Sequence, residues 1–247
     1  MEFQNSLFSL SGTKQLVVGG SRGLGLELAL HLKSVGADLL VIGRSKNPES
    51  ESIKSVYRSC DMGDLASLRQ IVDKFVGDSL LGGVSMVAGV SYSSLDIPDP
   101  GNRFLKTIES NVILPYMCMN LVKDFLGLGS SVLFFSSINA ELGFPGNPGY
   151  VTSKAGMSGL TRALATDWAN DGIRVNSLQL GYFHTQMTNQ SFIDPKKFKQ
   201  RQERSLLNRW GKTDEILGPA QFLLSGASSF ITGQAITVDG GWVVKGL

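Results

Sequence analysis

The sequence has few of the features that mark disulfide-bonded, membrane-spanning or nucleic-acid-binding proteins. Its two cysteines, Cys60 and Cys118, stand at no metal-ligand spacing to each other or to a histidine, so we expect buried free thiols and no metal site. No apolar run approaches the roughly 20 residues that cross a bilayer. The net charge of +2 is too small to indicate a nucleic-acid partner. We therefore expect neither a membrane nor a nucleic acid as a partner.

The opening residues also lack a targeting signal. The stretch MEFQNSLFSLSG has no cationic region followed by a long apolar run, so no signal peptide is expected. Free thiols are typical of a reducing compartment, which favours a cytoplasmic protein. With 42% hydrophobic and 18% charged residues, the composition favours a folded chain over a disordered one. A length of 247 residues suits one α/β domain.

Short apolar runs rich in β-branched residues alternate with longer segments of helical period. The runs lie at residues 15–20, 39–43, 55–60, 84–90, 131–137, 174–180 and 234–241. The helical segments between them lie at residues 23–36, 64–77, 111–125, 150–169 and 214–226. This alternation predicts βαβ units and a doubly wound parallel sheet of about seven strands. The polar residues 184–211 interrupt the pattern, and we expect them to form a lid, called the lid segment below.

A glycine-rich turn joins the first predicted strand to the first predicted helix. Glycine permits a tight turn and lets a pyrophosphate approach the backbone at the N-terminus of a helix. The spacing is G-x-x-x-G-x-G, and a glycine-rich turn by itself is also typical of a purely structural loop. Its place between strand and helix favours a nucleotide site in a Rossmann-type domain. The expected contacts are Gly19, Ser21, Arg22, Gly23, Leu24 and Gly25.

The next strand end indicates which nucleotide is bound. NAD-binding chains carry an acid there that binds the ribose 2′-hydroxyl, whereas this chain has Arg44 and Ser45. A planar guanidinium suits a 2′-phosphate, and Arg22 lies in reach of the same group, so NADP(H) is preferred over NAD(H). The alternative is a pair of solvated surface arginines. Asp61 and Met62, at the end of the third strand, are expected beside the adenine, unless they form a simple turn.

Three side chains form a candidate catalytic group. Tyr150 and Lys154 are four residues apart in a helical segment and share one face, while Ser137 ends a predicted buried strand. A nearby cation favours phenolate and lowers the tyrosine pKa from its usual value near 10. Bringing that pKa to neutrality needs about 4 kcal/mol. Such a tyrosine exchanges a proton with a carbonyl or alcohol.

Along essentially its whole length, the chain resembles the short-chain dehydrogenase/reductase family. The residues that carry the resemblance are Gly19, Gly23, Gly25, Asp61, Ala88, Gly89, Asn111, Ser137, Tyr150, Lys154, Asn176, Gly181, Thr185 and the ending FITGQAITVDGGW. The resemblance implies one oxidoreductase domain over residues 1–247 that moves hydride between a nicotinamide and a carbonyl. Homotetramers or homodimers are the expected assembly.

The resemblance also implies individual roles. Tyr150 would be the general acid/base, Lys154 would lower its pKa and hold the ribose, and Ser137 would bind the substrate oxygen. Asn111 would anchor a proton-relaying water. The remaining expected cofactor contacts are Ala88, Gly89, Phe183 and Thr185, beside Tyr150 and Lys154 themselves. The alternatives are purely structural: Ser137 would form a turn at the end of its strand, and Asn111 would use its hydrogen bonds at a kink in its helix.

Three places depart from the family pattern. Val18 stands where a threonine is usual, and Met86-Val87 stands where two asparagines are usual. Replacing both sides of a buried hydrogen bond by apolar groups is nearly neutral, so we expect Val18 to pack against Met86 or Val87. Leu180 replaces a proline beside Gly181, which leaves this hinge less restrained and favours a mobile lid segment.

The substrate is less constrained. Stretches that would dock an acidic carrier protein, residues 125–131 and 169–172, contain no lysine or arginine, which disfavours the alternative of a 3-oxoacyl thioester reductase. A non-catalytic NADP(H)-sensing or scaffold protein is disfavoured by the intact catalytic group. Basic residues of the lid segment indicate either a solvated helix face or a site for an anionic substrate such as a sugar derivative. They are Lys196, Lys197, Lys199, Arg201 and Arg204, with Asn139, Asn147, Tyr182 and His184 as pocket candidates.

Overall fold

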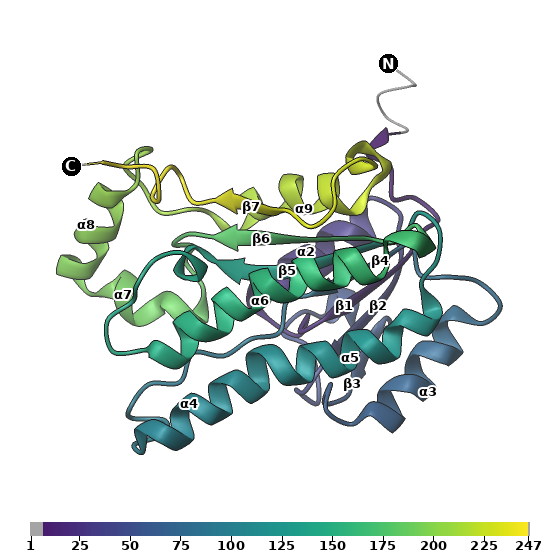
Figure 1. Ribbon diagram of the computed structural model, residues 1–247, viewed down its shortest axis with the longest axis horizontal. Helices are drawn as coiled ribbons and strands as arrows, with labels where there is room; N and C mark the ends of the chain where they lie inside the picture. The colour runs from purple at the N-terminus through teal and green to yellow at the C-terminus, as the bar shows by residue number, and fades with distance from the viewer. Residues whose placement is uncertain (1–6, 247) are drawn as a thin grey trace.

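The computed structural model describes residues 7–246 and contains the predicted parallel sheet of seven strands (Figure 1). The strand order is β3-β2-β1-β4-β5-β6-β7, and all six pairings are parallel. The strands are β1 (Lys14–Val18), β2 (Asp38–Gly43), β3 (Tyr57–Ser59), β4 (Gly83–Met86), β5 (Ser131–Ser137), β6 (Arg174–Leu180) and β7 (Ala235–Val238). Residues 1–6 and 247 lie outside the described residues. They include the predicted ends of the domain and half of the N-terminal stretch in which no signal peptide is expected.

Helices cover both faces of the sheet. The α-helices of the described residues are α2 (Gly23–Ser34), α3 (Leu65–Val76), α4 (Pro100–Ile108), α5 (Leu114–Val122), α6 (Pro148–Asp167), α7 (Asn189–Ile193), α8 (Pro195–Arg204) and α9 (Leu217–Leu224). Alternate strand residues point to opposite faces. Thus Val18 joins a buried cluster with α3, α5 and α6, while Val17 joins a second cluster with α2 and α9. Each face therefore has its own core.

Two helical regions differ from the sequence prediction. The helix expected over residues 111–125 begins earlier, at Pro100, and passes through a π-helical turn, Glu109–Ile113, before α5. The lid segment, for which the sequence pattern indicated only a polar insertion, contains α7 and α8. Both lie beyond the carboxyl ends of β5 and β6 (Figure 1). Within residues 7–246, no helix is long and apolar enough to cross a membrane.

The expected apolar replacement at the first strand is confirmed for Met86. Val18 and Met86 are register partners in β1 and β4, and both side chains are buried in the same cluster. Val87 instead packs against the cluster on the other face. The backbone amides of Val87 and Ala88 donate to the Val18 carbonyl at 2.9 and 3.0 Å, which fixes the turn after β4. Cys60 and Cys118 are buried and free, as expected.

Candidate active site

The strand order reverses direction between β1 and β4, and crevices for ligands form at the carboxyl ends of strands at such points. The structure has a cleft of about 790 Å³ there. It is lined by all the predicted cofactor contacts, namely Gly19, Ser21, Arg22, Gly23, Leu24, Gly25, Arg44, Ser45, Asp61, Met62, Ala88, Gly89, Tyr150, Lys154, Phe183 and Thr185. Ser137 lines it as well, so the cleft joins the nucleotide residues to the catalytic group.

The glycines of the first loop are required by close packing. Gly19 has a φ of +94°, and a Cβ added there would lie 2.5 Å from the Ala88 backbone nitrogen. A Cβ on Gly25 would overlap the Gly19 carbonyl oxygen. Gly23, at a φ of +55°, instead faces open space at the start of α2. This tight backbone, open toward the helix N-terminus, fits a dinucleotide pyrophosphate.

The outer end of the cleft has a basic rim. Arg22 is the residue before α2, Arg44 follows β2, and both side chains are exposed. Neither forms an ion pair with any described residue. The Tyr57 hydroxyl donates to the Ser45 carbonyl at 2.6 Å and holds this turn in place. Sequence reasoning missed Tyr57, whose only signal was an aromatic residue in the neighbouring strand.

Asp61 both forms a turn and lines the cleft. Its Oδ1 accepts a hydrogen bond from the Gly63 amide at 2.8 Å, which makes a tight turn after β3. The same residue and Met62 line the cleft. The simple turn and the cleft wall are therefore one feature.

At the inner end, β5 and α6 bring the three catalytic candidates together. Tyr150 lies in the first turn of α6, whose preceding residue Asn147 accepts a hydrogen bond from the Tyr150 amide at 3.2 Å. Lys154 is buried, and its Nζ lies 5.6 Å from the centre of the Tyr150 ring. That Nζ donates to the Phe135 carbonyl at 2.9 Å. Ser137, at the end of β5, forms a side-chain hydrogen bond with Tyr150.

The expected lowering of the Tyr150 pKa is wrong for the protein alone. Burial raises this pKa, the hydrogen bond with Ser137 opposes the rise, and the nearby Tyr182 adds to it. Burial also lowers the pKa of Lys154 to about 8, because the ammonium loses its hydration. The i, i+4 spacing placed the two groups correctly but carried no information about their shared desolvation.

Ser137 and Asn111 each have a structural contact besides the expected function. Ser137 Oγ accepts from the Asn139 amide at 3.2 Å, as a strand-end turn would require. Asn111 lies in the π-helical turn and does not line the cleft; its amide bonds both backbone groups of Val90 at 2.8 Å and Ser153 Oγ at 3.0 Å. Asn111 therefore connects the loop after β4 to α6.

The substrate end of the cleft includes residues that sequence reasoning missed. They lie in the loop after the Ala88-Gly89 turn or just after Thr185, and this closeness in the chain was the available signal. They are Ser91, Tyr92, Asp96, Gln186, Met187 and Thr188. Conversely, none of the four pocket candidates lines the cleft: Asn139, Asn147, Tyr182 and His184. Asn147 instead caps α6, and the His184 ring stacks on Phe192 with ring centres 3.7 Å apart.

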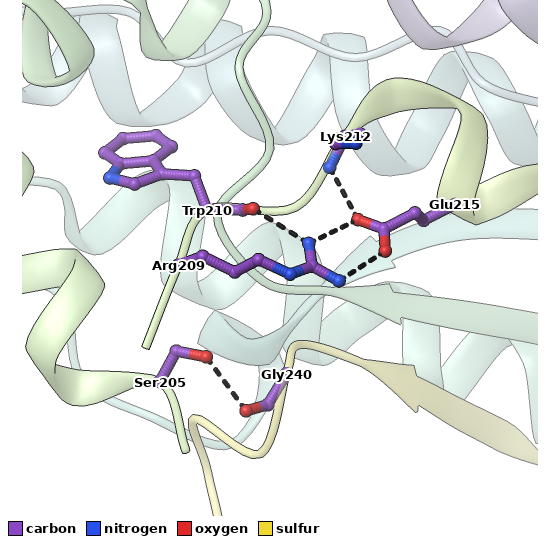
Figure 2. Close-up of polar contacts among 6 residues, drawn as sticks. All are labelled: Ser205, Arg209, Trp210, Lys212, Glu215 and Gly240. Carbon is purple, nitrogen blue, oxygen red and sulfur yellow. Dashed lines mark hydrogen bonds and ion pairs between the residues drawn. The ribbon is translucent and has the colours of Figure 1, made fainter. Parts of the chain in front are cut away.

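The lid segment is fastened at its C-terminal end (Figure 2). Arg209 and Glu215 form a bidentate ion pair with N–O distances of 2.5 and 2.7 Å. The hydrogen bonds from Arg209 are the main cause that lowers the pKa of Glu215 to about 2. Ser205 Oγ donates to the Gly240 carbonyl at 2.9 Å, which ties the end of α8 to the C-terminal tail. These bonds, with the one from Arg209 to the Trp210 carbonyl, hold Trp210 and the end of α8 in place.

Comparison with known proteins connects the whole chain to dehydrogenases and reductases. A family model described as enoyl-(acyl carrier protein) reductase matches residues 18–243. Gluconate 5-dehydrogenase of Gluconobacter oxydans (strain 621H) is 32% identical, over 97% of this chain and 98% of that protein. The 2-dehydro-3-deoxy-D-gluconate 5-dehydrogenase of Escherichia coli (strain K12) is 29% identical, over 97% and 99%.

Solved structures share the architecture. A gluconate 5-dehydrogenase from Burkholderia cenocepacia J2315, in complex with NADP and tartrate, superposes with a TM-score of 0.89. It is 26% identical, over 98% of this chain and all (100%) of that one. The RhlG protein of Pseudomonas aeruginosa, in a complex with NADP, gives a TM-score of 0.86 at 25% identity, over 96% and 98%. These alignments span nearly the whole chain.

Proposed function

Because the chain belongs to the short-chain dehydrogenase/reductase family, we propose that Tyr150 is the general acid/base of its oxidoreductase reaction. The enzyme acts on CH–OH groups with a nicotinamide cofactor, which supplies the acceptor or donor of the hydride. The observation that carries the proposal is the meeting of Ser137, Tyr150 and Lys154 at one end of the cleft. The catalytic domain extends over residues 1–247.

The chemistry of these side chains follows from their positions. In the oxidising direction, Tyr150 takes the proton from the substrate hydroxyl while Ser137 holds the oxygen, and hydride leaves the same carbon. In the reducing direction, carbon receives hydride and Tyr150 returns the proton. Lys154 places a cation beside the phenol and would hold the nicotinamide ribose. Asn111 holds the loop after β4 against α6. Its proposed further role, which the family resemblance implies, is to anchor a water that passes the proton to solvent.

We also propose that NADP(H) is preferred over NAD(H). Arg22 and Arg44 line the outer end of the cleft and have no acidic partner among the described residues. No acid stands at the end of β2 to bind a ribose 2′-hydroxyl. Two guanidinium groups are suited to the charge and geometry of a 2′-phosphate.

The proposed substrate is a hydroxylated acid of the sugar-acid class. Two kinds of similar protein carry the names gluconate 5-dehydrogenase and 2-dehydro-3-deoxy-D-gluconate 5-dehydrogenase. At the substrate end, Ser91, Tyr92 and Asp96 line the cleft with groups that bind hydroxyls. A long acyl chain would offer these polar groups no hydrogen bonds, whereas the hydroxyls of a sugar acid would.

The proposed assembly is a homotetramer in the cytoplasm. Large apolar side chains are exposed on α4, on α5 and in the turn between them, which supports a contact with a second copy. They are Leu105, Ile113, Tyr116 and Met117. Phe230 and Val244 are exposed on either side of β7, where a further contact would cover them. The two buried free thiols suit a reducing compartment.

The test is turnover across a substrate panel. Absorbance of NADPH and NADH is followed with D-gluconate, other sugar acids, neutral polyols and 3-oxoacyl thioesters. Tyr150→Phe should lower kcat by about 10²- to 10⁴-fold, because it removes the proton donor and keeps the ring. Tyr116→Phe, on α5 and outside the cleft lining, is the matched control, because the substitution keeps the ring at the proposed subunit contact. Full activity of Tyr150→Phe would refute the mechanism, and turnover of thioesters alone would refute the substrate.

A further inference from the structure

Arg201 differs from the other basic side chains of α8. Lys196, Lys199 and Arg204 are exposed, whereas Arg201 is half-buried and its guanidinium carbon lies 4.9 Å from the centre of the Tyr182 ring. The helix explains this placement, because Arg201 follows Phe198 by three residues and shares its inward face. Phe198 stacks on Trp210 with ring centres 5.8 Å apart, which fixes that face against the body of the protein.

The guanidinium of Arg201 has hydrogen-bonding capacity that the described residues leave unused. Its Nε is buried without a partner, and no carboxylate within residues 7–246 forms an ion pair with it. Its remaining contacts are neutral: the Tyr182 hydroxyl, Gln200 Oε1 at 3.3 Å and the Lys197 carbonyl at 3.5 Å. A buried polar nitrogen without a partner is rare in a folded protein and points to a ligand.

Tyr182 connects this guanidinium to the catalytic tyrosine. It directly follows Gly181, which lines the cleft, and it lies close enough to Tyr150 to affect that residue electrostatically. Two tryptophans hold its ring in place, with ring centres 4.7 Å away at Trp242 and 5.6 Å away at Trp210. Arg201 and Tyr182 do not themselves line the cleft, so the guanidinium lies just beyond the cleft wall on the side of the lid segment, with the Tyr182 ring between it and Tyr150.

We propose that Arg201 recognises the carboxylate of the substrate, with Tyr182 holding the guanidinium in place. This inference rests on the proposed sugar-acid substrate. A sugar acid carries its carboxylate several bonds from the carbon that exchanges hydride, which suits an arginine beyond the catalytic tyrosine. The planar fork of arginine matches a carboxylate with two parallel hydrogen bonds. Lys196 and Lys197 are exposed, and Lys197 already faces Asp194 at 3.6 Å, so these lysines are not the recognising groups.

The experiment compares an acid with its neutral analogue. KM and kcat are measured with NADP⁺ for D-gluconate and for D-gluconamide, in the wild type and in Arg201→Met, Arg201→Lys and Arg204→Met. Arg201→Met should raise KM for gluconate by about 10- to 100-fold, because a charged hydrogen-bonded pair is lost. Its KM for gluconamide should stay unchanged. Arg201→Lys keeps the charge without the fork and should give an intermediate KM, while Arg204→Met should match the wild type.

Each other outcome has a definite meaning. An equal rise in KM for acid and amide would show that Arg201 only supports Tyr182, and an unchanged KM for gluconate would refute the proposal while leaving the sugar-acid function intact. A wild type that oxidises neutral polyols but neither binds nor oxidises sugar acids would refute the proposed substrate, and this inference with it. If Arg201→Met does not fold, Arg201→Lys and Arg201→Gln supply the same comparison.

Discussion

At the scale of single residues, Lys154 is placed where stability alone would not put it. Its side chain is 7% exposed, and its ammonium has one hydrogen bond, to the Phe135 carbonyl. Removing a cation from water costs more than one such bond returns, and burial accordingly lowers the Lys154 pKa to about 8. We infer that the charge is kept in the cleft for its effect on Tyr150 and the cofactor.

Lys154→Met should separate stability from activity. Below pH 8 the variant should lose turnover and unfold at a higher urea concentration than the wild type. Between pH 8 and 10.5 the unfolded wild type retains a proton that the folded protein has lost, so the free energy of unfolding of the wild type rises with pH by up to about 3 kcal/mol. The gap in unfolding free energy between the variant and the wild type therefore closes. Urea titrations without cofactor, below and within this interval, measure the gap. A gap that is constant with pH, as expected for the exposed control Lys196→Met, would contradict the explanation.

Residue types, spacing and the family resemblance were enough to predict the cofactor contacts and, except for Asn111, the catalytic side chains that line the cleft, because strand ends and the i, i+4 rule fix their positions. They were not enough for the direction of the Tyr150 pKa shift, which depends on desolvation by distant segments. Tyr182 is a second case in which distant packing overrides a prediction from position in the chain. Its place after β6 suggested a pocket residue, but packing between two tryptophans keeps it outside the cleft wall.

At the scale of elements, the lid segment is a small helical unit with one fastened end. Asp194 accepts hydrogen bonds from the amides of Lys196 and Lys197, and Pro195 occupies the first helical position of α8. This Asp-Pro pair is a strong start signal for a helix, and it was the available evidence for α8 in a segment predicted only as a polar insertion. The aromatic contacts to Trp210 join residues distant in the chain and gave no local signal.

Glu215→Gln should loosen the lid segment without unfolding the protein. The substitution removes the ion pair with Arg209, whose bonds hold Trp210 and the end of the segment (Figure 2). Both side chains are partly exposed, so little change in Tm is expected. Trypsin should cleave the lid segment several times faster than in the wild type, as opening becomes easier. Glu203→Gln, which removes the exposed ion pair with Lys199, is the control and should be cleaved by trypsin at the wild-type rate. Equal rates in all three would show that the ion pair does not restrain the segment.

At the scale of the whole molecule, the strand order gives the cleft its two ends. Because β2 and β4 flank β1, the basic residues after β2 lie on one side of the glycine loop and the catalytic residues of β5 and α6 on the other. A cofactor that spans this cleft contacts both halves of the sheet. Binding of the cofactor therefore stabilises the native state as a whole, in proportion to the logarithm of its concentration over Kd.

This linkage gives a test of cofactor choice that needs no substrate. NADP⁺ should raise Tm more than NAD⁺ at equal concentration, because only NADP⁺ brings a 2′-phosphate to Arg22 and Arg44. Arg44→Ala should reduce the NADP⁺ shift to near the NAD⁺ shift, and it should leave the NAD⁺ shift unchanged. Arg58→Ala, on the neighbouring strand β3 and outside the cleft lining, should keep the wild-type difference. Equal shifts for both nucleotides in the wild type would contradict the preference, since the arginines would then be solvated surface groups.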